Sequence, residues 1–147
     1  MIYFATDHQG FALKEKLKEF VGGLGYEVKD FGAFEEDPED DYPNFIRRAA
    51  EAVSKNPTRD KAIILGGSGQ GEAIVANRFS SVRAAVFYGG PMDIIKLSRE
   101  HNDANILSLG AGFIDEAIAK EAVRLWLATP FSGEERHIRR IREIDEI

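Results

Sequence analysis

A glycine-rich loop that ends on a glutamate is the part of this sequence best suited to do chemistry. It spans residues 66–72 (GGSGQGE), after the apolar run 62–65 and before a segment with helical periodicity. Glycines let successive backbone N–H groups turn toward one point, and the start of a helix adds a positive dipole end, so such a loop can hold an anion. Glu72 would repel that anion unless the carboxylate moves a proton next to the developing negative charge. The sequence therefore indicates an oxyanion-binding loop with an adjacent base.

The same residues also have a purely structural explanation. Glycine turns after strands are common in α/β proteins, and a glutamate in the first turn of a helix is favoured by the helix dipole alone. Two nucleotide-binding motifs do not fit, because no Lys-Ser or Lys-Thr pair follows the last glycine and Glu72 stands where the dinucleotide fingerprint has its third glycine. The loop by itself leaves both catalysis and simple packing open.

A second polar segment, residues 7–10 (DHQG), follows the first apolar run. Ligands of open parallel sheets bind beyond the carboxyl ends of the strands, where this segment and the glycine loop both fall. If the two strands are neighbours, the residues that come together are Asp7, His8, Ser68 and Glu72. Asp7 could instead cap the helix that follows, and His8 could be a surface residue at the helix start.

Two arginines near the carboxyl terminus have the spacing of a phosphate clamp. Arg136 and Arg140 share a helical face by the i, i+4 rule. On the same helix, Ile138 and Ile141 are expected to turn toward the body of the protein. Two guanidinium groups on one face can hold a phosphate. A solvated basic face is the simpler explanation, and the run alone favours it.

The remaining polar clusters suggest no metal. The acidic run 35–41 (EEDPEDD) is most simply an exposed loop, and its spacing matches no calcium loop. Residues 101–103 (HND) end a helix just before a strand, where the helix dipole favours a histidine. The three histidines are far apart and lack the spacing of metal ligands. We therefore expect neither a metal nor another cofactor.

Composition limits the class of protein. With 147 residues and no cysteine, the chain is expected to form one domain over residues 1–147, without disulfides, thiolate metal sites or cysteine nucleophiles. The amino terminus becomes polar too early for a signal sequence, and no apolar run approaches membrane-spanning length, so we expect a cytoplasmic protein without a membrane partner. A net charge of -6 argues against a nucleic-acid surface.

Five apolar runs alternate with helical segments along the chain. The expected strands are 2–6, 26–31, 61–65, 82–88 and 105–109, and the expected helices are 11–21, 44–54, 72–78, 91–99, 115–127 and 133–144. The strands are mostly apolar on both faces, as in a buried parallel sheet. This alternation predicts an α/β fold: a three-layer αβα sandwich around a five-stranded, parallel, Rossmann-like sheet. The order of the strands does not follow from the sequence.

The sequence as a whole resembles the type B ribose-5-phosphate isomerase family, which includes the galactose-6-phosphate isomerase subunits. The resemblance covers nearly the whole length. It rests on ordered motifs at residues 6–11 (TDHQGF), 41–43 (DYP), 66–72, 76–77 (AN), 99–105 (REHNDAN), 136–137 (RH) and 139–140 (RR).

This resemblance implies metal-free aldose–ketose isomerisation of a sugar phosphate through an enediolate. Glu72 would carry the proton between the two sugar carbons, while Asp7 and His101 would assist ring opening and proton traffic at the sugar oxygens. The residues implied for the sugar and the enediolate are Tyr42, Gly67, Ser68, Gly69, Gln70, Gly71 and Asn102. Those implied for the phosphate are His8, Arg136, His137 and Arg140.

Two positions depart from most members of that family. Many members have a cysteine base immediately before the second loop glycine, where this chain has Gly66. A second group lacks the cysteine and carries a glutamate at the position of Glu72, and this chain resembles that group. Phe113 stands in a stretch where many members carry an arginine that contacts phosphate, which puts phosphate affinity or substrate choice in question.

The order of elements also places His101. It ends a helix that leads into a strand, so within its own subunit it should lie near the amino edge of the sheet, opposite Glu72. We therefore expect His101 to reach the site of a neighbouring subunit, in the homodimer or dimer of dimers that the resemblance implies. The expected activity interconverts ribose 5-phosphate and ribulose 5-phosphate. The alternatives are an isomerase of a six-carbon sugar phosphate, galactose or allose 6-phosphate, and a sugar-phosphate binding module without catalysis.

Overall fold

Strands and helices alternate in the computed structural model, which describes all 147 residues. The strands are β1 (Ile2–Thr6), β2 (Val28–Asp30), β3 (Lys61–Gly66), β4 (Ala84–Phe87) and β5 (Ile106–Gly110). The helices are α1 (Phe11–Gly23), α2 (Pro43–Lys55), α3 (Gln70–Ala76), α4 (Asp93–Glu100), α5 (Glu116–Ala128) and α6 (Glu135–Asp145), with a short 3-10 turn at His8–Gly10. The predicted strands and helices are all present, with ends shifted by a few residues.

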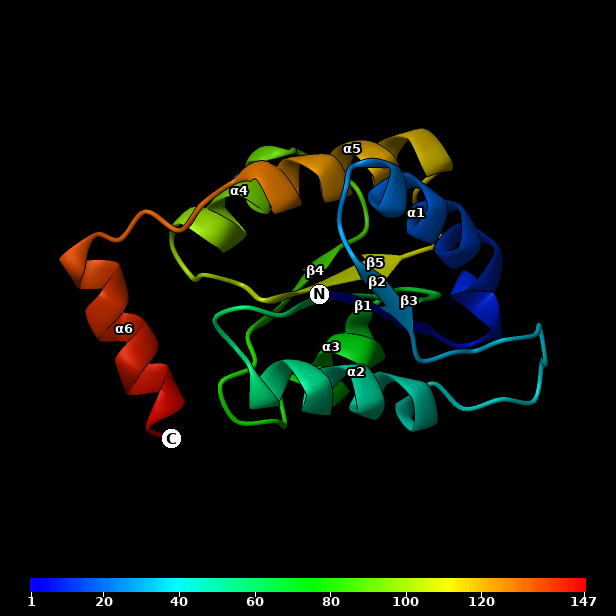
Figure 1. Ribbon diagram of the computed structural model, residues 1–147, viewed down its shortest axis with the longest axis horizontal. Helices are drawn as coiled ribbons and strands as arrows, with labels where there is room; N and C mark the ends of the chain where they lie inside the picture. Colours follow the sequence, from blue (N-terminus) through cyan, green and yellow to red (C-terminus); the bar gives the residue numbers. More distant parts are fainter.

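The five strands form one parallel sheet in the order β2-β1-β3-β5-β4. Helices α1, α4 and α5 cover one face of the sheet, and α2 and α3 cover the other (Figure 1). The predicted three-layer α/β sandwich is therefore confirmed. None of its helices combines the length and the apolar character that crossing a membrane requires.

Each face of the sheet has its own apolar core. Ile63 of β3 packs into the core that includes Trp126 of α5, whereas its neighbour Ile64 packs into the core that includes Val53 of α2. Successive side chains of a strand point to opposite faces, so a strand that is apolar throughout supplies both cores.

The strand order creates a switch point between β1 and β3. From β1 the chain moves outward to β2, and from β3 it moves in the other direction, toward β4 and β5. In sheets of this kind, ligands bind in the crevice at the carboxyl ends of such a strand pair. The segments that follow β1 and β3 are the two polar segments that the sequence singled out.

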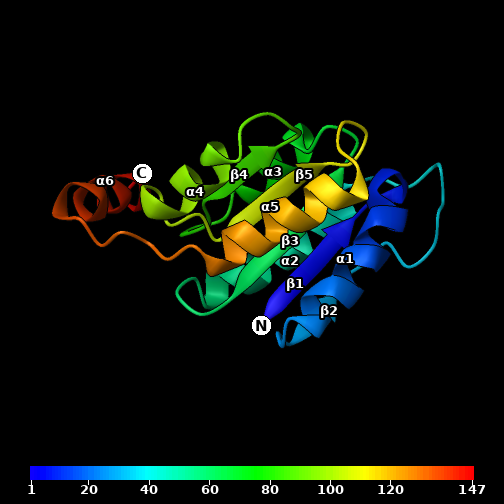
Figure 2. The same ribbon diagram turned by 90° about the horizontal axis from the view of Figure 1, so that it is seen from above.

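Helix α6 lies apart from the sandwich, beyond the end of α4 (Figures 1 and 2). It is fastened to the body by an ion pair between Arg83 and Asp145, with Nη1 and Oδ2 3.3 Å apart, and by His137, which is buried. The prediction that Ile138 turns toward the body is wrong, because its side chain is 41% exposed. His137, Ile141 and Asp145 follow one another at intervals of four, so the contacts at His137 and Asp145 turn Ile138 away from the body.

Candidate active site

Pairing of β1 with β3 brings the two polar segments together at the carboxyl edge of the sheet. Thr6 pairs with Leu65 in the register of the two strands, and the Thr6 hydroxyl donates a hydrogen bond of 2.9 Å to the Leu65 carbonyl. The glycine loop and the turn that begins at Asp7 therefore start side by side. We call the residues gathered here the carboxyl-edge cluster; its predicted members are Asp7, His8, Tyr42, Gly67, Ser68, Gly69, Gln70, Gly71 and Glu72.

The glycine loop presents free hydrogen-bond donors. The carbonyl oxygens of Gly66 and Gly67 accept from the N–H groups of Ala111 (2.8 Å) and Gly112 (3.0 Å), and Ser108 Oγ donates to the Gly69 carbonyl at 2.6 Å. By contrast, the N–H groups of residues 67–69 have no partner within the chain. A loop whose acceptors are occupied and whose donors are free is suited to bind an oxyanion.

The left-handed backbone of Gly69 (φ 76°) makes this conformation possible. A Cβ at this position would also lie 3.0 Å from the carbonyl carbon of Leu109. Glycine is therefore required here both by the backbone angle and by the close approach of β5.

Glu72 is buried beside the free donors. Its side chain is in the first turn of α3, the residue is only 4% exposed, and its carboxyl group occupies the space that a Cβ on Gly66 would need. Burial raises the pKa of Glu72, the hydrogen bond of its own backbone N–H opposes the shift, and the charge of Asp7 raises the pKa further. A carboxylate of raised pKa next to an oxyanion-binding loop is suited to act as a base near neutral pH.

Asp7 is the second buried carboxylate of the cluster. It caps the 3-10 turn, accepting a hydrogen bond of 2.9 Å from the Gln9 N–H, as the structural alternative anticipated. Its pKa is also raised, mainly by burial, while the Gln9 N–H works against the shift. Asp7 does more than cap the turn, because its charge also raises the pKa values of Glu72 and His8.

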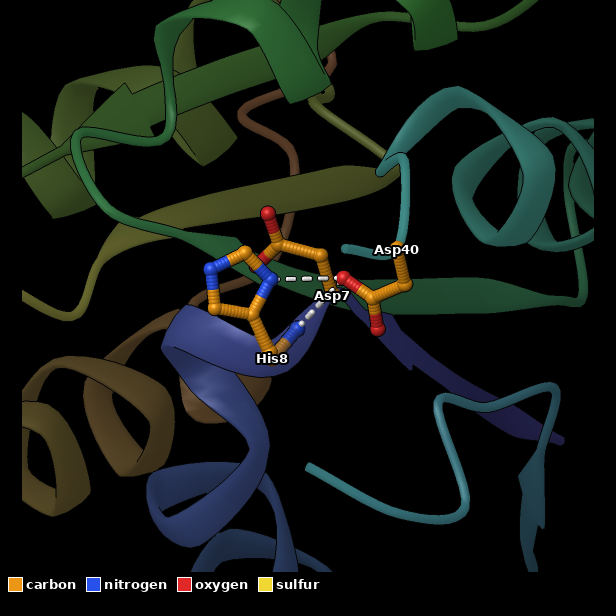
Figure 3. Close-up of side chains that lie close together, drawn as sticks. All are labelled: Asp7, His8 and Asp40. Carbon is orange, nitrogen blue, oxygen red and sulfur yellow. Dashed lines mark hydrogen bonds and ion pairs between the residues drawn. The ribbon is translucent and has the colours of Figure 1, made fainter. Parts of the chain in front are cut away.

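His8 is bound to Asp40, a residue of the acidic run that the sequence analysis assigned to an exposed loop. Figure 3 shows the contact: His8 Nδ1 lies 2.6 Å from Asp40 Oδ1, and the His8 backbone N–H donates to the same oxygen at 3.1 Å. The hydrogen bond to Asp40 raises the pKa of His8, against a smaller lowering by burial. Asp7, His8 and Asp40 each offer a metal-ligand atom within 4.8 Å of the others, and the 2.6 Å contact joins two of these groups in a direct hydrogen bond.

Two neighbours of the loop extend the cluster. The ring of Tyr42 packs against Gly71, and the carboxamide of Gln9 fills the space above Gly67. Gln9 and Asp40 were not among the predicted residues of this candidate site. The sequence did contain a signal for Gln9, because it directly follows the predicted site residues Asp7 and His8. Asp40 could be found only from the structure, in which its loop returns to His8.

A second group of predicted residues lies at the amino edge of the sheet. We call it the amino-edge cluster; its members are His101, Asn102, Arg136, His137 and Arg140. His101 caps the end of α4 and stacks on His137 of α6, with ring centroids 4.3 Å apart and planes at 16°. Burial lowers the pKa of His137, whose Nε2 is buried without a partner, and the nearby His101 lowers it further.

An internal ion pair supports the segment that carries His101. Arg99 is buried and its Nη1 binds Asp103 Oδ1 at 2.8 Å and the Ala104 carbonyl at 2.7 Å, while its Nε donates to the Thr129 carbonyl at 3.1 Å. The motif at residues 99–105 therefore has a structural part, in Arg99 and Asp103. Asn102 is exposed beside this ion pair.

The two clusters do not meet within one chain. His101 and Asn102 precede β5, whose five residues span about 16 Å before the chain reaches the carboxyl edge at Gly110. His101 and Glu72 are thus at opposite edges, as expected from the order of elements. Arg136 and Arg140 are likewise remote from His8, although the resemblance assigns all three to one phosphate.

Known proteins of similar sequence show the family to which this chain belongs. The model of the "Ribose/Galactose Isomerase" family matches residues 2–144. The chain belongs to this family. It is 37% identical over 140 residues to a ribose-5-phosphate isomerase B of Mycolicibacterium paratuberculosis, covering 95% of this chain and 86% of the relative. It is 36% identical over 146 residues to the Escherichia coli ribose-5-phosphate isomerase B, covering 99% of this chain and 95% of the relative.

Solved structures of ribose-5-phosphate isomerase B share the fold. The protein of Mycoplasma genitalium, with bound ribulose 5-phosphate, superposes with a TM-score of 0.94 at 34% identity, covering 99% of this chain and 93% of the other. The protein of Thermotoga maritima superposes with a TM-score of 0.90 at 42% identity, covering 99% and 97%. The resemblance to this family is confirmed over essentially the whole chain.

One feature of this isomerase-family chain is an exposed aromatic pair near the glycine loop. Phe113 and Tyr88 are 68% and 52% exposed, and their ring centroids are 6.0 Å apart in an edge-on arrangement. Both residues follow strands at the carboxyl edge, after β5 and β4. The stretch in which the resemblance implies an arginine therefore presents an uncharged aromatic surface in this chain.

Proposed function

We propose that this chain interconverts ribose 5-phosphate and ribulose 5-phosphate, with Glu72 as the base. Family membership supports an aldose–ketose isomerase, and the relatives named above are ribose-5-phosphate isomerases. The observation that carries the proposal is the buried carboxyl group of Glu72 beside the free N–H groups of residues 67–69. The family match over residues 2–144 supports one catalytic domain.

The arrangement suits proton transfer through an enediolate. Glu72 takes the proton from C2 of the open-chain aldose, the electrons of that C–H bond form the C1–C2 double bond, and the oxygen on C1 becomes an anion. The free N–H groups of the glycine loop stabilise this anion. Glu72 then returns the proton to C1, the hydroxyl on C2 loses its proton to leave the carbonyl, and the anionic oxygen on C1 gains a proton, which gives the ketose. The ring oxygen and hydroxyls exchange protons with Asp7 and with His101.

A complete site requires a second copy of the chain. His101, Arg136 and Arg140 would come from the amino-edge cluster of a neighbouring subunit and face the carboxyl-edge cluster of the first, in a homodimer or a dimer of dimers. Charge supports this pairing, because the carboxyl edge carries the carboxylates of Asp7 and Glu72, and cations from a neighbouring subunit would help it to hold a phosphate. The protrusion of α6 from the sandwich gives its exposed arginines the reach to do so (Figure 1).

The direct test is incubation of the purified protein with ribose 5-phosphate, followed by detection of the ketose. Formation of ribulose 5-phosphate by the wild type and its loss in Glu72→Gln support the proposal. A protein that binds the sugar phosphate without converting it is a binding module instead.

A six-carbon sugar phosphate is the second candidate substrate. The matching family includes galactose isomerases by its description. In addition, the exposed Phe113 places an uncharged side chain near the glycine loop, in the stretch where the resemblance implies an arginine. The ratio of kcat/KM values for ribose 5-phosphate, allose 6-phosphate and galactose 6-phosphate decides between the substrates.

A further inference from the structure

One carboxylate of the acidic loop 35–41 differs from the others. Glu35, Glu36, Asp37, Glu39 and Asp41 are exposed, whereas the side chain of Asp40 is only 10% exposed. Its Oδ2 is buried and has no hydrogen-bond partner. A buried carboxylate oxygen without a partner costs stability, so the position of Asp40 is not explained by the packing of the loop.

The other oxygen of Asp40 is occupied entirely by His8. Oδ1 accepts from the His8 backbone N–H at 3.1 Å and lies 2.6 Å from Nδ1 of the ring (Figure 3). Because one Asp40 oxygen contacts both the ring and the backbone N–H of His8, it fixes the His8 ring relative to the His8 backbone. Nδ1 then carries the proton that is donated to Asp40. Nε2 has no partner within the chain and is the nitrogen available to a ligand.

We propose that Asp40 is a positioning residue: it holds His8 with Nε2 free and keeps the ring protonated, so that His8 binds the substrate phosphate as a cation. This inference rests on the proposed function, in which His8 belongs to the sugar-phosphate site. It adds a residue from the acidic loop to that site.

The charges around His8 favour the protonated ring. Asp7 precedes His8 in the same turn, and Asp40 and Asp37 belong to the acidic loop. The negative charge of each of these three residues favours the protonated His8 ring, and the hydrogen bond to Asp40 contributes most to the raised pKa of His8. A neutral His8 would add no positive charge to a cluster that carries the carboxyl groups of Asp7, Asp40 and Glu72. A cationic His8 supplies a charged donor on the same chain as the oxyanion loop.

The test measures the charge of His8 and the affinity for inorganic phosphate in the same variants. The His8 ring is titrated by NMR, assigned with His8→Asn, in the wild type, Asp40→Asn and Asp40→Ala. Glu39→Gln is the matched control, because it removes an exposed carboxylate from the neighbouring position. We expect the pKa of His8 to fall in both Asp40 variants, and phosphate affinity at pH 7.5 to fall about 10-fold, the scale of one charged hydrogen bond. Glu39→Gln should change neither quantity.

A double variant separates positioning from a structural effect. If Asp40 acts through His8, the phosphate affinity of His8→Asn/Asp40→Asn equals that of His8→Asn alone. An unchanged His8 pKa in Asp40→Asn, or additive losses in the double variant, overturns the inference. Binding of Zn²⁺ that Asp40→Asn abolishes would also overturn it and make the cluster a metal site. These readouts need no turnover, so a wild type without isomerase activity would count against the proposed function and leave this inference to be decided by the titration.

Discussion

The carboxyl group of Glu72 occupies the space that a side chain on Gly66 would fill. Residues 66 and 72 therefore compete for one position beside the oxyanion loop. The family resemblance implies that many members have a cysteine at the position of Gly66. A cysteine side chain there would exclude this placement of Glu72. The geometry gives a physical reason for the pattern of the sequence, a glycine at one position and a glutamate at the other: either residue can bring a base to the same place, but not both.

Removing the basic oxygen of Glu72 should abolish most turnover. Glu72→Gln keeps the shape of the side chain, so kcat should fall by about 10²–10⁴, the usual contribution of a general base, with little change in phosphate binding. Glu121→Gln, on the exposed surface of α5, is the control and should retain wild-type kinetics. Retention of most of kcat by Glu72→Gln would assign the proton transfer to another group, such as Asp7.

A methyl group at residue 66 should displace Glu72 without touching the substrate. We expect Gly66→Ala to lower kcat by about 10-fold or more, because a small misplacement of a catalytic group is costly. Gly22→Ala is the control, since a Cβ there meets no atom within 4 Å. In Gly66→Cys/Glu72→Ala the thiol has the vacated space, so this variant should be more active than Glu72→Ala. If Gly66→Ala keeps wild-type kcat and KM, the position of Glu72 is not critical.

The raised pKa values of Glu72 and Asp7 link activity to stability. Above the ordinary glutamate value of 4.5, the unfolded chain releases the Glu72 proton while the folded chain retains it, so the free energy of unfolding falls as pH rises toward the folded pKa. Glu72→Gln should therefore have a higher Tm than the wild type at pH 7.5, and the difference should shrink at pH 4. The acid limb of kcat/KM should also lie above pH 4.5, because only the ionised carboxylate accepts a proton. Thermal unfolding curves and a pH–rate profile check both statements; equal Tm differences at the two pH values would contradict the first.

Mixing inactive variants tests whether the two clusters belong to different subunits. In a mixed dimer of Glu72→Gln and His101→Ala, one site carries both defects and the other carries neither. If subunits exchange at random, about a quarter of wild-type activity should return, because half of the dimers are mixed and each has one intact site. Glu72→Gln mixed with Asp7→Asn should recover nothing, since both defects lie in the carboxyl-edge cluster. Absence of recovery in both mixtures would place the complete site within one chain.

The arginines of α6 should matter for phosphate although they are distant from His8 in their own chain. Arg136→Ala and Arg140→Ala should each weaken phosphate and substrate binding by about 1.5–3 kcal/mol, the scale of a hydrogen bond to a charged group. Arg142→Ala, on another face of the same helix, is the control. Wild-type KM and phosphate inhibition in both alanine variants would show that the basic run is only a solvated face.

Local pattern in the sequence determined the elements and one half of the site. Apolar runs alternating with helical periodicity predicted the strands and helices because side-chain burial repeats with the local geometry of each element. The glycine loop and the motif at residues 7–10 indicated the place of a candidate site, since both follow strands. The order of elements also placed His101 at the opposite edge from Glu72.

Contacts between distant segments decided the rest, and these only the tertiary structure could show. The pairing of β1 with β3 brought Asp7 next to Glu72, and that pairing depends on long-range packing that no local pattern encodes. Burial then raised the pKa values of both carboxylates, where sequence could not say whether burial or the helix dipole prevails for Glu72. Asp40 contacts His8 because its loop folds back on that residue, while Ile138 is exposed because contacts at His137 and Asp145 set the rotation of α6. Sequence period predicts which face of an element is apolar, but the neighbour that covers that face is chosen by the whole fold.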